Sequence, residues 1–433
     1  MTSPIKFFSH TMEGAPQLTN AFGALTTLLD AVLINGFNTK TITSLTRSGT
    51  TVTASITAGH AYQLNQIVTI DGATPSDYNG EFRVTSTTAN DFTYEVTGSP
   101  TTPASGTITS KASPLGWQTA FTGTNKRVYR SLSPLSNKPF LRVDDSKAAA
   151  YTTTYAKKAK VTMAVNMTTI DVFQGGYAPY DSAAPTKGEV ATGSADAVYD
   201  GWFKWYYARA GGNGTDIAEP LEYNRAWFIV GDDRGFYLFN EGSDGGKMGG
   251  KCFTDFISYR AGDGFNTILC AQDAYAPASV NQSSWPNAGG EGYHTSDCGV
   301  RFTRAGDPVG KLALKGYAQI GAAVPVSFVS LHTVPQGTYN ISGYSTGISF
   351  PNGPDYGILL QPTLLKEGTH IRGRMPGMFW VHNNCGDSMS HGELITGVDG
   401  YPGRTFMMVH TTASDGFSTP NAFLAFDITG PWW

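Results

Sequence analysis

The chain has 433 residues, of which 40% are hydrophobic and only 15% are charged, whereas globular domains carry about 25% charged residues. The hydrophobic content excludes a disordered or fibrous chain, and the net charge of −4 argues against a dedicated nucleic-acid binder, which needs a basic surface. A surface poor in Glu and Lys favours turn-rich β-structure over long solvated helices.

Targeting and membrane segments are not expected. No apolar run of about 7–15 residues follows a basic start at the N-terminus, so we expect no secretory signal. No stretch of about 18 apolar residues occurs, so we expect no membrane span. The four cysteines are too few for a disulfide scaffold, and we expect free thiols in a reducing cytoplasm.

One amphipathic helix is predicted near the N-terminus, over residues 18–34. Apolar side chains recur there at intervals of three and four residues, as on one face of a helix. Asn20 is the expected N-cap, and Gly36 is the expected stop. We assign residues 1–42, an N-terminal arm with this helix, to the main domain.

A threonine-rich stretch, residues 43–113, has a chemistry of its own. It contains no Trp, Met or Cys, and short alternating segments follow one another at roughly ten-residue spacing. We predict a small β-sandwich or barrel inserted into a surface loop of its host, because a longer loop closes at little cost. The predicted strands are residues 51–56, 67–70, 82–85, 92–96 and 106–109.

The main domain is predicted to resume at residue 114 and to run to residue 433, with room for two subdomains. We expect a mainly β fold of sandwich or jelly-roll type. Its clearest element is a hairpin, in which apolar runs at 226–230 and 236–239 flank a polar turn. Long loops are predicted at 176–220 and 271–292, and further strands at 311–314, 327–331, 357–360 and 406–410.

No motif predicts an enzyme, a catalytic residue or a bound cofactor. Residues 245–252 nearly match a phosphate-binding loop, but Cys252 stands at the position of the metal-binding hydroxyl. Carboxylates are paired at 144–145 and 232–233, but adjacent residues of a strand point to opposite faces. Catalytic carboxylates face each other across a cleft, so we interpret both pairs as turn residues.

Two His/Cys pairs form the candidate metal site, His294 with Cys298 and His382 with Cys385. Four such side chains could close a tetrahedral zinc site. Nothing in the sequence requires the pairs to meet, and chance pairs are expected among eight His and four Cys. We therefore predict no resident metal.

Aromatic side chains are the candidates for interaction. The chain ends in Trp432 and Trp433, each of which can bury on the order of 200 Å². They are either plugs of the core, which we favour, or an interface anchor. Tyr177 and Tyr180 begin a predicted long loop, where tyrosines offer rigid contact area at low entropy cost.

A series of short blocks, taken in their order along the chain, resembles the structural proteins of tailed-bacteriophage virions and prophages. The blocks cover most of the chain outside 43–113, and residues 43–113 resemble the Ig-like inserts of phage tail and surface proteins. Trp433 stands where the family would carry a basic residue. The matching blocks are residues 12–18, 33–37, 116–126, 141–145, 227–237, 253–267, 371–377 and 428–432.

The resemblance implies a virion component of the tail, baseplate or collar, assembled in the cytoplasm of a host bacterium, and it brings no catalytic residues. Virion parts sit on symmetry axes, so the expected partners are copies of the chain and other virion proteins. The alternative is a recognition module at the tail, which binds a glycan or protein of the host surface.

Overall fold

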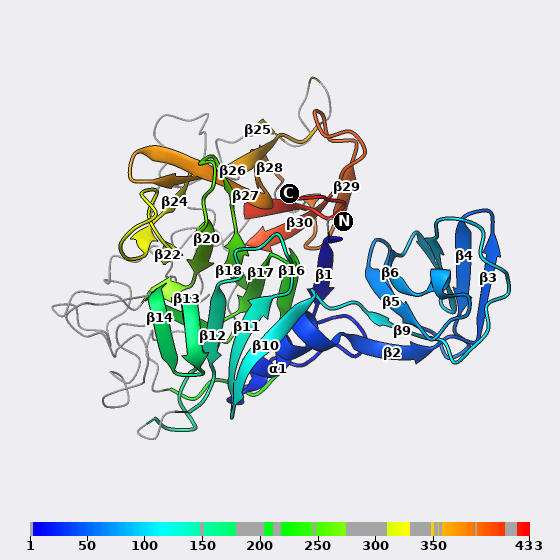
Figure 1. Ribbon diagram of the computed structural model, residues 1–433, viewed down its shortest axis with the longest axis horizontal. Coiled ribbons are helices and arrows are strands. Elements are labelled where there is room, and N and C mark those ends of the chain that lie inside the picture. The colour runs from blue at the N-terminus through cyan, green and yellow to red at the C-terminus, as the bar shows by residue number, and fades with distance from the viewer. Residues whose placement is uncertain are drawn as a thin grey trace.

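The computed structural model describes residues 3–147, 151–178, 203–210, 218–245, 248–273, 310–329, 348–349, 354, 357–385, 388–411 and 422–433. These residues are mainly β, with several antiparallel sheets and one α-helix, so the predicted β-sandwich-like class is confirmed. No helix among them is long and apolar enough to cross a membrane. Figure 1 shows a large body from which a smaller β-module projects.

Among the described residues, three seven-stranded sheets form the body. The first contains β1 (Lys6–Ser9), β16 (Trp227–Asp232), β17 (Gly235–Glu241), β18 (Met248–Asp255), β20 (Thr267–Cys270), β22 (Lys311–Ala313) and β23 (Val324–Pro325). The second contains β10 (Trp117–Gly123), β11 (Lys126–Ser131), β12 (Phe140–Asp144), β13 (Lys157–Thr169), β14 (Val172–Ala178), β15 (Phe203–Ala208) and β21 (Gln272–Asp273).

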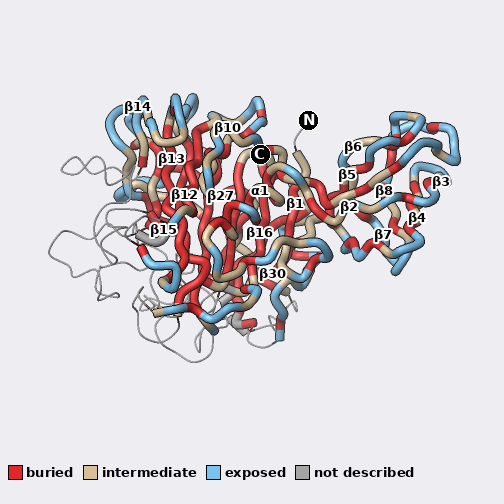
Figure 2. Tube along the Cα trace, turned by 90° about the horizontal axis from the view of Figure 1, so that it is seen from below, coloured by how far each residue is buried: buried red, intermediate tan, exposed pale blue. Residues whose placement is uncertain are grey.

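The third sheet contains β24 (Ser327–Val329), β26 (Leu360–Glu367), β27 (His370–Val381), β31 (Ala422–Asp427), β30 (Thr405–Thr411) and β29 (Leu394–Thr396), and β19 (Ile257–Ser258) pairs with β27. A short parallel pair joins β25 (Ile348–Ser349) to β28 (Asn383–Asn384). One hydrophobic cluster extends through all three large sheets, with Phe236, Val143 and Trp380 among its members. Figure 2 shows this buried core running through the body.

The inserted module consists of two four-stranded sheets. The first contains β2 (Phe37–Thr41), β9 (Thr109–Ala112), β5 (Ile67–Asp71) and β6 (Gly80–Arg83), and the second contains β3 (Ser44–Ser48), β4 (Thr51–Ser55), β8 (Asp91–Glu95) and β7 (Ser86–Thr87). A 3-10 turn, η2, spans Ser76–Tyr78. The sheets enclose a hydrophobic cluster of their own, which extends from Ile42 to Ile108. Strands β6 and β9 are displaced by two and three residues from the predicted segments, and β2 precedes residue 43.

The predicted helix is shorter than its hydrophobic pattern. The α-helix α1 spans Ala24–Asp30, and a π-helical turn, η1, continues it over Ala31–Asn35. Residues 18–23 are not helical, so the prediction of Asn20 as N-cap is wrong. The backbone of Leu18 is instead bonded to a distant segment: its N–H donates to Asn224 Oδ1 at 2.8 Å and its carbonyl accepts from Arg225 N at 3.0 Å. Gly36 ends the helical segment as predicted.

The predicted hairpin is confirmed as β16 and β17. Asp232 shapes its turn, since Oδ1 accepts hydrogen bonds from the backbone N–H groups of Arg234 at 2.8 Å and Gly235 at 3.1 Å. Every residue of β16 is buried, because the strand lies between β1 and β17 and has the core on both faces. A strand that is buried on both faces has a continuous apolar sequence rather than an alternation of apolar and polar residues.

Two other predictions of secondary structure are wrong. Residues 203–208 were expected in a long loop, but they form β15, whose six residues are all buried and whose neighbours are β13 and β21. Likewise, the predicted strand at 357–360 overlaps β26 only at Leu360. Composition averaged over a long window conceals a short aromatic strand. The predicted loops also begin within strands, since residues 176–178 belong to β14 and residues 272–273 to β21. Residues 179–202, 211–217 and 274–292 of the predicted loops lie outside the described residues.

Candidate interaction sites

Trp432 lies in the core of its own chain. It is 5% exposed, its indole N–H donates to the carbonyl of Asp427 at 2.8 Å, and its ring meets that of Tyr237 at 5.9 Å. The ring packs directly on Gly377, which has a φ of 61°. This is the position that the core alternative predicts for this residue.

Trp433 lies on the turn of the β16–β17 hairpin and is only partly buried. Its indole N–H donates to Asp232 Oδ2 at 2.5 Å, and the guanidinium carbon of Arg234 lies 3.7 Å from the ring centroid. Burial raises the pKa of Asp232 to about 6, although the hydrogen bond from Trp433 opposes the shift. The last residue of the chain is therefore fixed in place while it keeps some exposed surface.

Tyr177 lies on β14 and is partly buried. Its ring stacks on Phe173 at 4.9 Å, beside a small cluster that includes Val128 and Phe140. The second tyrosine candidate, Tyr180, lies outside the described residues. Tyr177 thus lies in a strand rather than in the predicted loop, and it contributes to the packing of this cluster.

The candidate zinc site can be assessed only at one of its two pairs, because His294 and Cys298 lie outside the described residues. His382 Nε2 lies 2.8 Å from Gln361 Oε1, and Cys385 is buried with its sulfur 3.7 Å from the carbonyl of Asn383. Burial raises the pKa of Cys385 to about 12, which disfavours the thiolate that binds zinc. Within the described ranges, no three His, Cys, Asp or Glu side chains gather as a metal site would require.

The carboxylates at 144–145 serve two separate structural contacts. Burial by itself would raise the pKa of Asp144, but Lys160 at 2.9 Å and Arg142 at 3.1 Å hold it well below its usual range. Asp145 instead caps α1, since Oδ2 accepts a hydrogen bond from the N–H of Leu25 at 3.0 Å. Complete burial raises the pKa of Asp145 to about 7.

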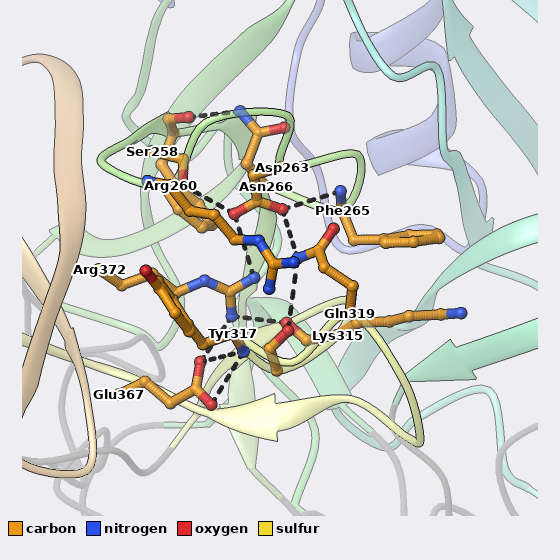
Figure 3. Close-up of polar contacts among 12 residues, drawn as sticks. Ser258, Arg260, Asp263, Phe265, Asn266, Lys315, Tyr317, Gln319, Glu367 and Arg372 are labelled. Atoms are coloured by element: carbon orange, nitrogen blue, oxygen red, sulfur yellow. Dashed lines mark hydrogen bonds and ion pairs between the residues drawn. The ribbon is translucent and has the colours of Figure 1, made fainter.

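A buried arginine joins three surface segments of the body, as Figure 3 shows. Arg372 is 1% exposed and comes from the start of β27. Its Nη1 donates to Glu367 Oε2 at 2.8 Å and to the carbonyl of Lys315 at 2.5 Å, and its Nη2 lies 3.4 Å from Asp263 Oδ2. The guanidinium thus connects the β26–β27 turn to the segments 258–266 and 315–320.

Asp263 organises the other side of this network. Its carboxylate accepts hydrogen bonds from Ser258 Oγ at 2.8 Å, Gln319 Nε2 at 2.8 Å and the backbone N–H of Phe265 at 3.0 Å (Figure 3). Burial opposes the charged form, but these hydrogen bonds and Arg372 lower the pKa of Asp263. The carboxylate therefore stays ionised and holds the two loops against the arginine.

Large side chains stand exposed on this network. Tyr259 is 58% exposed, Tyr317 51%, Ile320 76% and Ile371 42%; we call these four residues and Arg260 the Tyr259–Tyr317 patch. Sequence reasoning missed it, because its members come from three short segments separated by 50 residues or more. The available signal was a tyrosine in two of the three segments, Tyr259 and Tyr317, each close to glycines in the sequence, and this signal is weak by itself.

Trp433 and the Tyr259–Tyr317 patch share one property, a fixed support beneath exposed side chains. Trp433 is held by the hairpin turn, and the Tyr259–Tyr317 patch is held by Arg372 and Asp263. Side chains ordered before binding lose less entropy when a partner arrives. Comparison with protein-family models and with curated proteins finds no match for this chain.

Proposed function

We propose that this chain is a structural component of a tailed-phage virion, in the tail, baseplate or collar, and that it works through contacts with copies of itself and with other virion proteins. The ordered sequence blocks support the proposal, as does the mainly β architecture. The observation that carries it furthest is the module held away from the body on β2 and β9 (Figure 1).

The attachment of the module supports a positional role. Phe37 at the start of β2 and Ala112 at the end of β9 belong to the core of the body, and the two strands continue from there into the module. Lys6 stabilises the junction between module and body, since its Nζ donates to Glu81 Oε1 of the module at 2.6 Å and to the carbonyl of Pro114 at 2.5 Å. Two strands and a buried cation limit rotation of the module about the body.

Purified particles that contain the chain provide the test. Chemical crosslinking followed by mass spectrometry should join it to other virion proteins, at a constant copy number per particle. A chain that co-purifies but is never crosslinked to another virion protein would contradict the proposal. A copy number that falls with each purification step would also contradict it.

A second function, recognition of the host surface, is favoured by the outer sheet of the module. Thr46, Thr53 and Thr93 lie in register across β3, β4 and β8. In Figures 1 and 2, β3 and β4 lie at the end of the module farthest from the body. Inward positions such as Val52 are fully buried, so this face presents hydroxyl groups and few apolar side chains. A hydroxyl array can hydrogen-bond a polysaccharide.

Glycan arrays and cell binding with the purified protein test this second function. Binding should be lost in a Thr53→Glu variant, which places a charge at the centre of the array, and kept in a Leu221→Glu variant, which changes an exposed residue of the body. If the unmodified protein binds neither a glycan nor the cells, recognition of the host surface is contradicted.

A further inference from the structure

We propose that the Tyr259–Tyr317 patch is the surface through which this chain binds a different polypeptide of the same assembly, one whose contact surface is apolar at its centre and acidic at its rim. The inference rests on the proposed virion function and assigns a surface to it.

The first argument is the kind of side chain that is exposed. Two tyrosines and two isoleucines are each more than two fifths exposed on neighbouring segments. Single exposed apolar residues are ordinary on protein surfaces, but a group of them marks a contact site. Tyr is enriched at protein interfaces, and the aliphatic Ile320 and Ile371 suit an apolar protein surface better than a sugar, whose edges are hydroxyl groups.

The second argument is that the patch is held rigidly. The N–H of Tyr259 donates to the carbonyl of Arg372 at 2.8 Å, and the N–H of Tyr317 donates to Glu367 Oε2 at 2.9 Å. Gln319, next to Ile320, is bound to Asp263 at 2.8 Å. Binding by these side chains therefore requires little ordering of the backbone beneath them.

The third argument is charge. Asp263 and Glu367, the carboxylates of the network, both contact Arg372 and are neutralised there. At the surface, Arg260 lies 5.2 Å from the ring of Tyr317, and the partly exposed Lys315, two residues before Tyr317, holds its ammonium 4.1 Å from the ring centroid of Phe265. The patch thus presents cations around its apolar residues, and a complementary partner carries carboxylates.

The same charges disfavour a twofold contact between identical patches. In such a contact both copies bring Arg260 and Lys315 to the interface, while Asp263 and Glu367 are already paired with Arg372. Like charges facing each other across an interface are costly. A different polypeptide with an acidic rim satisfies both the apolar and the charged parts of the patch.

Site-specific photocrosslinking in assembled particles tests the assignment. The probe is Tyr317→p-benzoyl-L-phenylalanine, and the matched control places the same residue at Leu221, which is 66% exposed and belongs to no part of the patch. Irradiation should join position 317 to another polypeptide, within a peptide whose neighbouring surface residues are acidic. The yield at position 221 should be far lower.

A charge exchange then identifies the contact. Arg260→Glu should lower the yield at position 317 roughly tenfold, about the effect of losing one close charge pair. Substitution of the facing carboxylate of the partner by Lys should restore it. The thermal midpoint of each variant, followed by tryptophan fluorescence, should match that of the unmodified chain, which shows that lost contact is not lost folding.

The outcomes separate this inference from the function on which it rests. Particles that contain the chain, but give crosslinks from position 317 only to copies of the chain or at the yield of position 221, overturn the patch assignment and leave the virion proposal standing. Particles that lack the chain overturn both.

Discussion

The packing of Trp432 on Gly377 leads to a sharp prediction about stability. A methyl group added at Gly377 would overlap the indole ring, whose nitrogen is also bonded to Asp427. The backbone at Gly377 has a φ of 61°, which costs a residue with a Cβ about 1–2 kcal/mol. Gly400 is the matched control, because its φ is 77° but no atom lies within 4 Å of the added carbon.

The magnitude follows from these contacts. Expelling Trp432 from the core should lower the free energy of unfolding by about as much as replacing a buried Trp by Ala, about 3–5 kcal/mol. Gly377→Ala should therefore lower the free energy of unfolding by about 4–7 kcal/mol, and Gly400→Ala by about 1–2 kcal/mol. Once Trp432→Ala has removed the ring, Gly377→Ala should cost only the backbone strain. The double variant should then be about as stable as Gly377→Ala alone.

Urea unfolding followed by tryptophan fluorescence is the appropriate assay. All eight tryptophans lie outside residues 43–113, so the signal reports the body and is insensitive to unfolding of the module. If Gly377→Ala and Gly400→Ala were equally destabilising, or the effects of Gly377→Ala and Trp432→Ala simply added, Trp432 would not occupy the core as described.

Three further predictions concern buried charge and the module. As pH rises from about 4 to about 7, Asp145→Asn should gain stability relative to the unmodified protein. Folding raises the pKa of the Asp145 carboxyl from 3.8 to about 7, so the stability that this carboxyl contributes is lost as pH rises through that window. Urea midpoints at several pH values measure the difference between the two proteins, and a difference that stays constant with pH would refute the prediction. Lys6→Met should accelerate hydrogen exchange in β6, because it removes the ion pair with Glu81. Lys40→Met breaks a more exposed ion pair, with Glu13, and should change the exchange rate less. Equal effects of the two variants would show that Lys6 does not stabilise the junction between module and body. Residues 37–113 expressed alone should unfold cooperatively by circular dichroism, because the module has its own core; a gradual transition would show dependence on the body.

The predictions from sequence succeeded where the pattern was local. Thr51, Thr53 and Ser55 alternate with Val52 and Ala54, and β4 places the first set outward and the second set inward. The β16–β17 hairpin was equally predictable, because a polar turn separates two apolar runs and Asp232 closes the turn with its own side chain. Such features depend on a few consecutive residues.

The predictions failed where distant residues decide the structure. The start of α1 is fixed by Asp145, about 120 residues along the chain, and Leu18 in the segment before the helix is held by Asn224, so no local cap could reveal where the helix begins. The network beneath the Tyr259–Tyr317 patch combines Asp263, Glu367 and Arg372, whose proximity arises only when β19 pairs with β27. Neither contact leaves a periodic trace in the sequence.

Cryo-electron microscopy of the assembled particle tests the central proposal most directly. The proposal predicts density for this chain in a symmetric ring or spike, with the Tyr259–Tyr317 patch covered by another virion protein and the module extending from the body on β2 and β9. A complete particle map whose density is accounted for by other proteins, with no position for this chain, would contradict it.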